Sequence, residues 1–207
     1  MFYDLSVSLS NETVTYPSDP AVSFSKIFNI DENGYNVTSI CMGSHSGTHV
    51  DLPFHCFKDG ENTAIMPLDH FFGDAVVLDV PCEAGEPLNL NESDLCDVKK
   101  GGILIIRTGW ENRSGQNSFF INFPYFSMDT AERLVALGVK AVGTDLPSVD
   151  KFGSKGEIHR IILSKNIIII ESLVNLSPLV GNRCFFSAVP LKIEQGDGSP
   201  VRAYAII

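Results

Sequence analysis

The residues of this chain that are best suited to chemistry lie close together between positions 45 and 55. Three of the five histidines, His45, His49 and His55, fall in this window, and Asp51 lies between the last two. Imidazole nitrogens and carboxylate oxygens are common ligands of zinc, and with more oxygen or water ligands the site can suit manganese. A lone histidine is usually a surface or hydrogen-bonded residue, but three histidines around an aspartate favour a metal site.

The backbone of this segment is expected to be extended or looped. Gly47 and Pro53 disfavour a continuous helix through the four polar residues. On a strand-like path His49 and Asp51 point to the same face, because side chains alternate with a period of two. The conformational freedom of Gly47 allows the chain to turn, so that His45 can return beside His49. These three residues therefore form a competent metal site, and the two oxygens of Asp51 could bridge two ions.

Two further acidic residues follow apolar segments that read as strands. Asp145 comes after the run 141–143, and Glu171 comes after the four isoleucines at 167–170. In open α/β sheets, ligands collect outside the carboxyl ends of the strands. Carboxylates at these positions are therefore well placed to take part in a site.

One more histidine can approach Glu171. His159 lies on a predicted short helix at 156–164, immediately before the strand that ends at Glu171. A helix, a tight turn and a strand can bring these two side chains together. Alone the pair is a weak signal that is better explained as a surface histidine and a strand-end acid, but beside the first cluster it predicts a second metal half-site. His70 has no such neighbours in the sequence, and we assign it no role.

The elements that must position these residues alternate between strands and helices. Short β-branched runs bounded by turn residues predict buried strands, and a helix is expected to start near Ser127 or Asp129 and end at Gly138. The interval 127–171 favours local parallel pairing, so we expect an α/β fold with a substantial antiparallel share in one domain, 1–207. The expected strands are 3–8, 35–42, 75–80, 103–108, 139–143, 167–170, 184–191 and 201–207; the expected helices are 91–99, 127–137 and 156–164; and the expected loops are 10–20 and 110–124.

Composition and charge narrow the range of partners. The formal net charge of −10 disfavours nucleic acid and anionic membrane surfaces. No apolar run approaches the roughly 18 residues needed to cross a bilayer, and the first residues do not resemble a signal peptide. The five cysteines include no Cys-x-x-Cys pair, which argues against a disulfide framework or a thiolate zinc site. We therefore expect a soluble cytoplasmic protein with no nucleic-acid or membrane partner.

The segment from Ser44 to His55 carries the pattern His-x-Gly-Thr-His-x-Asp-x-Pro-x-His. This pattern resembles the signature of the cyclase family of metal-dependent hydrolases, which includes bacterial kynurenine formamidase and isatin hydrolase. The resemblance extends over nearly the whole chain. It includes Asp4-Leu5-Ser6, Tyr16-Pro17-Ser18-Asp19-Pro20, Arg107-Thr108-Gly109, Gly143-Thr144-Asp145 and the spacing from His159 to Glu171.

The resemblance implies a compact β/β/α domain with a mixed sheet, the swivelling β/β/α fold of the cyclases. It also implies a homodimer or a higher homo-oligomer, in which residues near the start of one chain approach the active site of a neighbour.

The resemblance also implies a role for each candidate site residue. His45, His49 and Asp51 match the ligands of a first metal ion, and a bridging Asp51 with His159 and Glu171 matches a second site. The cofactor would be zinc or manganese, with one or two ions per subunit. His55 matches the catalytic acid and base. Tyr16 stands where the formamidases carry an aromatic substrate contact, commonly tryptophan.

The implied partner is a small-molecule substrate, and the implied reaction is hydrolysis of a carbon–nitrogen bond in an aryl formamide such as N-formylkynurenine, which is a step of tryptophan breakdown. One alternative is the hydrolysis of a cyclic amide such as isatin. A second alternative is a non-catalytic metal-binding module, which would have no need of His55. Trp110 and the pair Phe119-Phe120 could stack on an aryl group or serve in ordinary packing, so they are not assigned to the site.

Overall fold

Short, apolar, β-branched segments build the centre of the molecule. The computed structural model describes all residues from Met1 to Ile207. Its four central strands lie side by side and run parallel to one another; they are β5 (Phe72–Asp79), β7 (Ile103–Arg107), β9 (Ala141–Thr144) and β10 (Ile168–Glu171). Parallel strands that are covered on both faces carry nearly continuous apolar runs. The predicted strands at 75–80, 103–108, 139–143 and 167–170 correspond to these four.

Antiparallel strands extend the sheet on both sides of this parallel centre. The nine strands have the order β1-β13-β11-β5-β7-β9-β10-β4-β12. The outer strands are β1 (Phe2–Asp4), β13 (Tyr204–Ile206) and β11 (Arg183–Ser187) beyond β5, and β4 (His49–Asp51) and β12 (Gly198–Pro200) beyond β10. This single α/β domain with one mixed, curled sheet confirms the predicted fold class.

Several outer strands are shorter than the sequence predicts. The predicted strand at 3–8 ends at Asp4, because the backbone N–H of Val7 bonds to the Thr48 side chain rather than to a strand. The predicted strand at 184–191 ends at Ser187, ahead of Pro190, which has no N–H to donate to a ladder. The predicted strand at 201–207 keeps only its last residues, Tyr204–Ile206.

The sheet separates two apolar cores. Along β7, Ile103 and Ile105 belong to one buried cluster, whereas Leu104 and Ile106 belong to the other. This division follows from the alternation of side chains along a strand. The cluster that contains Leu104 also takes residues from the two longer helices, so these helices cover that face of the sheet.

The two longer helices follow the expected boundaries. Helix α2 (Met128–Leu137) begins after Ser127, whose side chain accepts a hydrogen bond from the N–H of Thr130, and it ends at Gly138 with a φ of 69°. Helix α3 (Glu157–Leu163) lies within the predicted range 156–164. None of the helices has the length and apolar character that a membrane crossing requires.

The remaining connections contain only short elements. The predicted helix at 91–99 is reduced to the 3₁₀ turn η3 (Glu92–Leu95), in which Asn91 and Asp94 form a capping box. The predicted loop at 110–124 contains two 3₁₀ turns, η4 (Trp110–Arg113) and η5 (Asn117–Phe120). The other short elements are η1 (Pro53–His55), η2 (Leu68–Phe71), η6 (Ser177–Leu179) and the two-stranded pair β6 (Pro87–Leu88) and β8 (Tyr125–Phe126).

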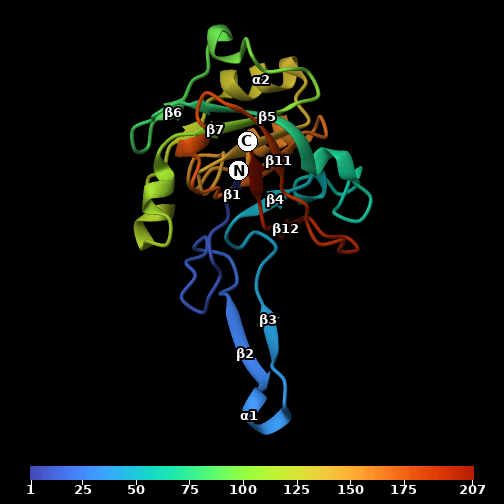
Figure 1. Cartoon of the computed structure of the whole chain (residues 1–207). Helices are drawn as coiled ribbons and strands as arrows, with labels where there is room; N and C mark the ends of the chain where they lie inside the picture. Colours follow the sequence, from blue (N-terminus) through green and yellow to red (C-terminus); the bar gives the residue numbers. More distant parts are fainter.

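A separate hairpin extends away from the body of the protein (Figure 1). It pairs β2 (Ser23–Phe28) with β3 (Val37–Cys41) and carries the short helix α1 (Ile30–Asn33) at its tip. Every residue of β3 is exposed. The sequence predicts the second strand, at 35–42, but not its partner.

Candidate metal centre

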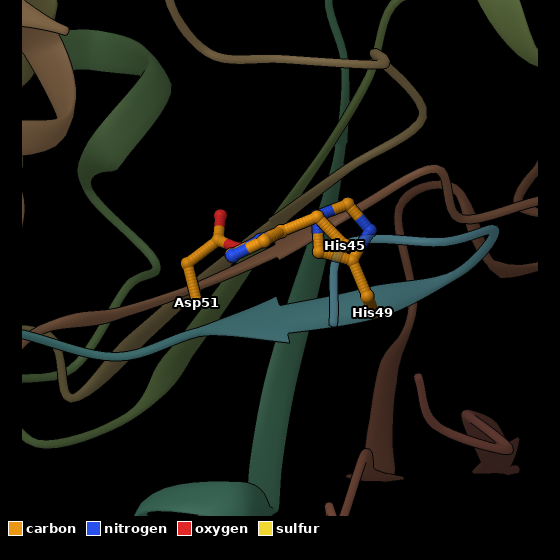
Figure 2. Close-up of side chains that lie close together, drawn as sticks. All are labelled: His45, His49 and Asp51. Carbon is orange, nitrogen blue, oxygen red and sulfur yellow. The ribbon is translucent and has the colours of Figure 1, made fainter. Parts of the chain in front are cut away.

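Strand β4 carries the first half of the candidate site. His49 and Asp51 are the two ends of this three-residue strand, and their side chains lie on the same side of it, as alternation requires (Figure 2). His45 returns to the same place, with its ring centroid 5.1 Å from that of His49. Oδ1 of Asp51 lies 2.6 Å from Nδ1 of His45 and 3.2 Å from Nε2 of His49.

A glycine makes this turn possible. Gly47 has a φ of 63°, in the left-handed region, and a Cβ atom at this position would lie only 2.6 Å from Cδ2 of Leu9. Both the backbone conformation and the close approach to Leu9 therefore select glycine. The expected return of His45 toward His49 depends on this residue.

The second half of the candidate site comes from β10 and α3. Glu171 is the last residue of β10 and His159 lies on α3, and both are buried. Nε2 of His159 lies 3.4 Å from Oδ2 of Asp51 and 3.3 Å from Oε1 of Glu171. The structure thus brings together the five predicted ligands, with Asp51 between the two halves.

The spacing of these polar atoms suits a divalent ion. Two donor sets that share Asp51 each have their ligand atoms within 4.8 Å of one another: His45, His49 and Asp51 form the first, and Asp51, His159 and Glu171 form the second. Several pairs are separated by 3.2–3.5 Å. Two atoms bound tetrahedrally to one zinc ion, each at about 2.0–2.1 Å, are separated by about 3.3 Å.

An unpartnered oxygen supports the same interpretation. Oδ2 of Asp51 is buried and has no hydrogen-bond partner. Leaving such an acceptor unsatisfied costs about 1–3 kcal/mol, and more for a charged group. A cation between Asp51 and His159 would satisfy this oxygen, so the residues present fit a metal ion.

Each of the three imidazoles uses its other nitrogen to contact an acceptor. Nδ1 of His49 lies 2.8 Å from the carbonyl oxygen of Gly47. Nδ1 of His159 lies 2.6 Å from Oδ2 of Asp150, and Nε2 of His45 lies 3.0 Å from Oδ2 of Asp197. Such contacts orient metal-binding histidines and set which nitrogen is free to coordinate.

Asp150 and Asp197 are two polar residues that the sequence does not reveal as parts of the site. Asp150 is buried, and it also accepts hydrogen bonds from the backbone N–H groups of Ile158 and His159 at the start of α3. Its position nine residues before His159 in the chain is the only available signal. That spacing is not a known ligand pattern, so the contact becomes visible only in the fold.

The buried carboxylates and imidazoles of the centre shift one another's pKa values. Burial alone would lower the pKa of His45, but the charge of Asp51 and hydrogen bonds to Asp197 and Asp51 raise it to about 10. Burial would raise the pKa of Asp51, yet the charges of His49 and His45 hold it well below its usual range. Without a metal ion, protons on the imidazoles therefore balance the buried carboxylates.

The candidate centre opens into a cavity of about 220 Å³. His55 lines this cavity with its side chain one-third exposed, and its ring centroid lies 4.2 Å from that of His45. Tyr16 and Phe120 form an aromatic part of the wall, with ring centroids 5.9 Å apart in an edge-to-face arrangement. Phe152 packs against Tyr16 at 5.5 Å.

Other residues considered in the sequence lie away from the cavity. Asp145 is buried and accepts hydrogen bonds from the backbone N–H groups of Thr108, Gly109 and Glu111, so it anchors the loop after β7. Trp110 is buried and donates its indole N–H to the Phe119 carbonyl. These contacts give Asp145 and Trp110 structural roles.

Comparisons with known proteins agree with this architecture. The model of a family described as "Putative cyclase" matches residues 3–151. Kynurenine formamidase from Salinibacter ruber is 34% identical over 205 residues, which covers 97% of this chain and 94% of the relative. The enzyme of the same name from Erythrobacter litoralis is 32% identical over 203 residues, with coverage of 97% and 91%.

A solved structure extends the similarity to three dimensions. The crystal structure of an isatin hydrolase bound to the product analogue thioisatinate has a TM-score of 0.87 and 26% identity, and the match covers 100% of this chain and 92% of that chain. The mixed sheet of this chain is thus similar to that of an isatin hydrolase over the whole chain. The chain belongs to the cyclase family.

Proposed function

We propose that this cyclase-family hydrolase is a metal-dependent amidohydrolase that cleaves the carbon–nitrogen bond of an aryl formamide such as N-formylkynurenine. The observation that carries this proposal is a pair of buried donor sets sharing Asp51 at the floor of a cavity that also contains His55. The relatives named kynurenine formamidase, which are similar over nearly their full length, support this substrate class.

Zinc or manganese is the proposed cofactor, with one or two ions per subunit. His45, His49 and Asp51 would hold the first ion, and Asp51, His159 and Glu171 would hold the second. A bound divalent ion polarises a carbonyl oxygen and lowers the pKa of water from 15.7 toward about 7. The carboxylates and neutral imidazoles would hold the positive charge of the ion in a buried position next to the cavity.

His55 is the proposed acid and base. Its imidazole lines the cavity beside His45, where it can accept a proton from the attacking water and deliver it to the leaving nitrogen. Water adds its oxygen to the formyl carbon, the carbon–nitrogen bond breaks, and the products are formate and the free arylamine.

The aromatic wall of the cavity is the proposed binding surface for the aryl group. Tyr16 and Phe120 are adjacent there, and aromatic rings favour offset or edge-to-face contacts with one another. Phe120 thus joins Tyr16 as a candidate substrate contact. The sequence offers Phe120 only as one of several aromatic residues in a loop.

We also propose that the protein forms a homodimer through the hairpin β2–β3. A two-stranded hairpin is marginally stable alone, and this one exposes several large apolar side chains, which are Ile27, Ile30, Tyr35, Val37 and Ile40. A second copy is the occupant that the family resemblance implies. Sedimentation should give twice the chain mass for the natural protein, whereas Val37→Glu with Ile40→Glu should give a single chain.

The substrate proposal is tested by comparing N-formylkynurenine with isatin on the metal-loaded protein. We expect turnover of the formamide to exceed that of isatin. Preferential hydrolysis of isatin would favour the cyclic-amide alternative, which the similarity to an isatin hydrolase structure supports. Absence of turnover on both, in protein shown to hold metal, would contradict the proposed substrate class.

A further inference from the structure

A single carboxylate oxygen lies between the candidate metal centre and the candidate proton-transfer residue. Oδ2 of Asp197 is 3.0 Å from Nε2 of His45 and 3.5 Å from Nδ1 of His55. The Asp197 side chain is 39% exposed, so the carboxylate lies at the rim of the centre rather than at its floor. Asp197 therefore contacts one predicted ligand and the predicted acid and base at once.

The backbone at Asp197 and Gly198 lies close to β4 and to the His45 ring. The carbonyl oxygen of Asp197 accepts a hydrogen bond from the N–H of Leu52 at 3.0 Å. The next residue, Gly198, pairs with Asp51 across β12 and β4. A Cβ atom on Gly198 would lie 2.8 Å from Cε1 of His45 and 2.7 Å from the carbonyl oxygen of Val50. A side chain at position 198 would therefore push against the His45 ring.

We infer that Asp197 is a positioning residue that accepts the Nδ1–H of His55 and the Nε2–H of His45. This inference rests on the proposed function, in which His55 moves a proton. With its proton held at Nδ1, His55 keeps Nε2 free to accept a proton from water. With its proton held at Nε2, His45 keeps Nδ1 directed at Asp51, from which it is 2.6 Å away.

The alternative to this positioning role is that Asp197 is itself a metal ligand. His45, His55 and Asp197 also lie close enough together to hold a metal ion. In that arrangement His45 would coordinate through Nε2, the nitrogen that faces away from Asp51, and Asp197 would be a ligand. The two roles predict different metal contents when the carboxylate is removed.

The test compares Asp197→Ala with the matched control Glu194→Gln, which changes an exposed acid on the same loop. Metal content, kcat, KM and the imidazole nitrogen NMR signals of the zinc-loaded protein are measured for each. With zinc in excess, we expect Asp197→Ala to keep the full metal content and a nearly unchanged KM, while kcat falls by about 10- to 100-fold. The proton of neutral His55 should lie on Nδ1 in the natural protein and redistribute between both nitrogens in the variant.

Asp197→Asn, which keeps the shape and one acceptor oxygen, serves if the alanine variant does not fold, and should show a smaller effect in the same direction. Loss of a metal equivalent that excess zinc does not restore, in either variant, would identify Asp197 as a ligand and overturn the inference. An unchanged kcat together with an unchanged His55 spectrum would also overturn it. If the natural protein hydrolyses no substrate, the proposed function fails, and the His55 spectrum alone still decides the positioning role.

Discussion

His49 and Glu171 face each other as paired residues of the antiparallel strands β4 and β10, and Nε2 of His49 lies 3.5 Å from Oε2 of Glu171. The two halves of the candidate centre are therefore joined by the register of backbone pairing. A shift of one residue would turn Glu171 to the opposite face of the sheet. In the observed register Ile169 pairs with Asp51 and Ile170 pairs with Val50, so Glu171 stays beside His49.

Replacing His55 by alanine should reduce turnover without reducing metal binding. The side chain lines the cavity but belongs to neither of the two donor sets that share Asp51. We expect metal content to stay unchanged and kcat to fall by about 10²- to 10⁴-fold, the range typical of a lost acid or base. His70→Ala, outside the cavity, is the control. Full activity of the His55 variant would remove this residue from the mechanism.

Replacing Asp51 by asparagine should affect both ions at once. Each oxygen of Asp51 faces a different donor set, and an amide is a much weaker metal ligand than a carboxylate. We expect Asp51→Asn to lose both equivalents, and Glu171→Gln to lose mainly the ion beside His159. Elemental analysis of the dialysed proteins measures this. Equal losses in the two variants would contradict the central position of Asp51.

Asp150→Asn should weaken the second half-site selectively. The carboxylate of Asp150 holds Nδ1 of His159 at 2.6 Å, and removing such a partner costs about 10- to 100-fold in metal affinity or activity. Calorimetric titration with zinc should therefore show a weakened second ion and an unchanged first ion. Equal weakening of both ions would instead indicate a general disturbance of the fold.

Metal affinity should rise with pH across the neutral range. In the metal-free protein the raised pKa of His45, about 10, means that its imidazole carries a proton that the ion must displace. Affinity should therefore increase by about tenfold per pH unit for each displaced proton. Zinc titrations in buffers of different ionisation enthalpy would report the proton count. A pH-independent affinity with no proton release would contradict this electrostatic account.

The protonation of His45 also makes the stability of the metal-free protein depend on pH. Because the pKa of His45 is raised on folding, protonation of His45 stabilises the folded state fully below about pH 6.5, the value of an unperturbed histidine. This contribution is lost as the pH rises toward about 10. Chemical unfolding of the chelated protein should thus show a falling free energy of unfolding over that interval.

The first half of the centre could be predicted because it depends on local chemistry. Alternation along a short strand places His49 with Asp51, and the turn at Gly47 returns His45. The approach of His159 to Glu171 could be expected from chain order, since a helix directly precedes a strand. The central strands were predictable for a related reason: burial on both faces leaves continuous apolar runs.

The other parts of the site and of the fold could not be predicted, because they depend on loops and on exposed surfaces. Asp150 and Asp197 reach their imidazoles from connecting segments whose paths follow no periodic pattern. The strand β2 escaped prediction because Ser23, Ser25 and Lys26 interrupt its apolar residues, whereas β3 contains the β-branched residues Val37, Thr38 and Ile40. Such features leave little hydrophobic signal in the sequence.

The most direct test of the account is hydrolysis of N-formylkynurenine before and after removal of metal by a chelator, followed by stepwise return of zinc or manganese. We expect the chelated protein to be inactive and its turnover to return in proportion to bound metal, in the natural protein but not in Asp51→Asn. Sustained hydrolysis by fully metal-free protein would contradict it.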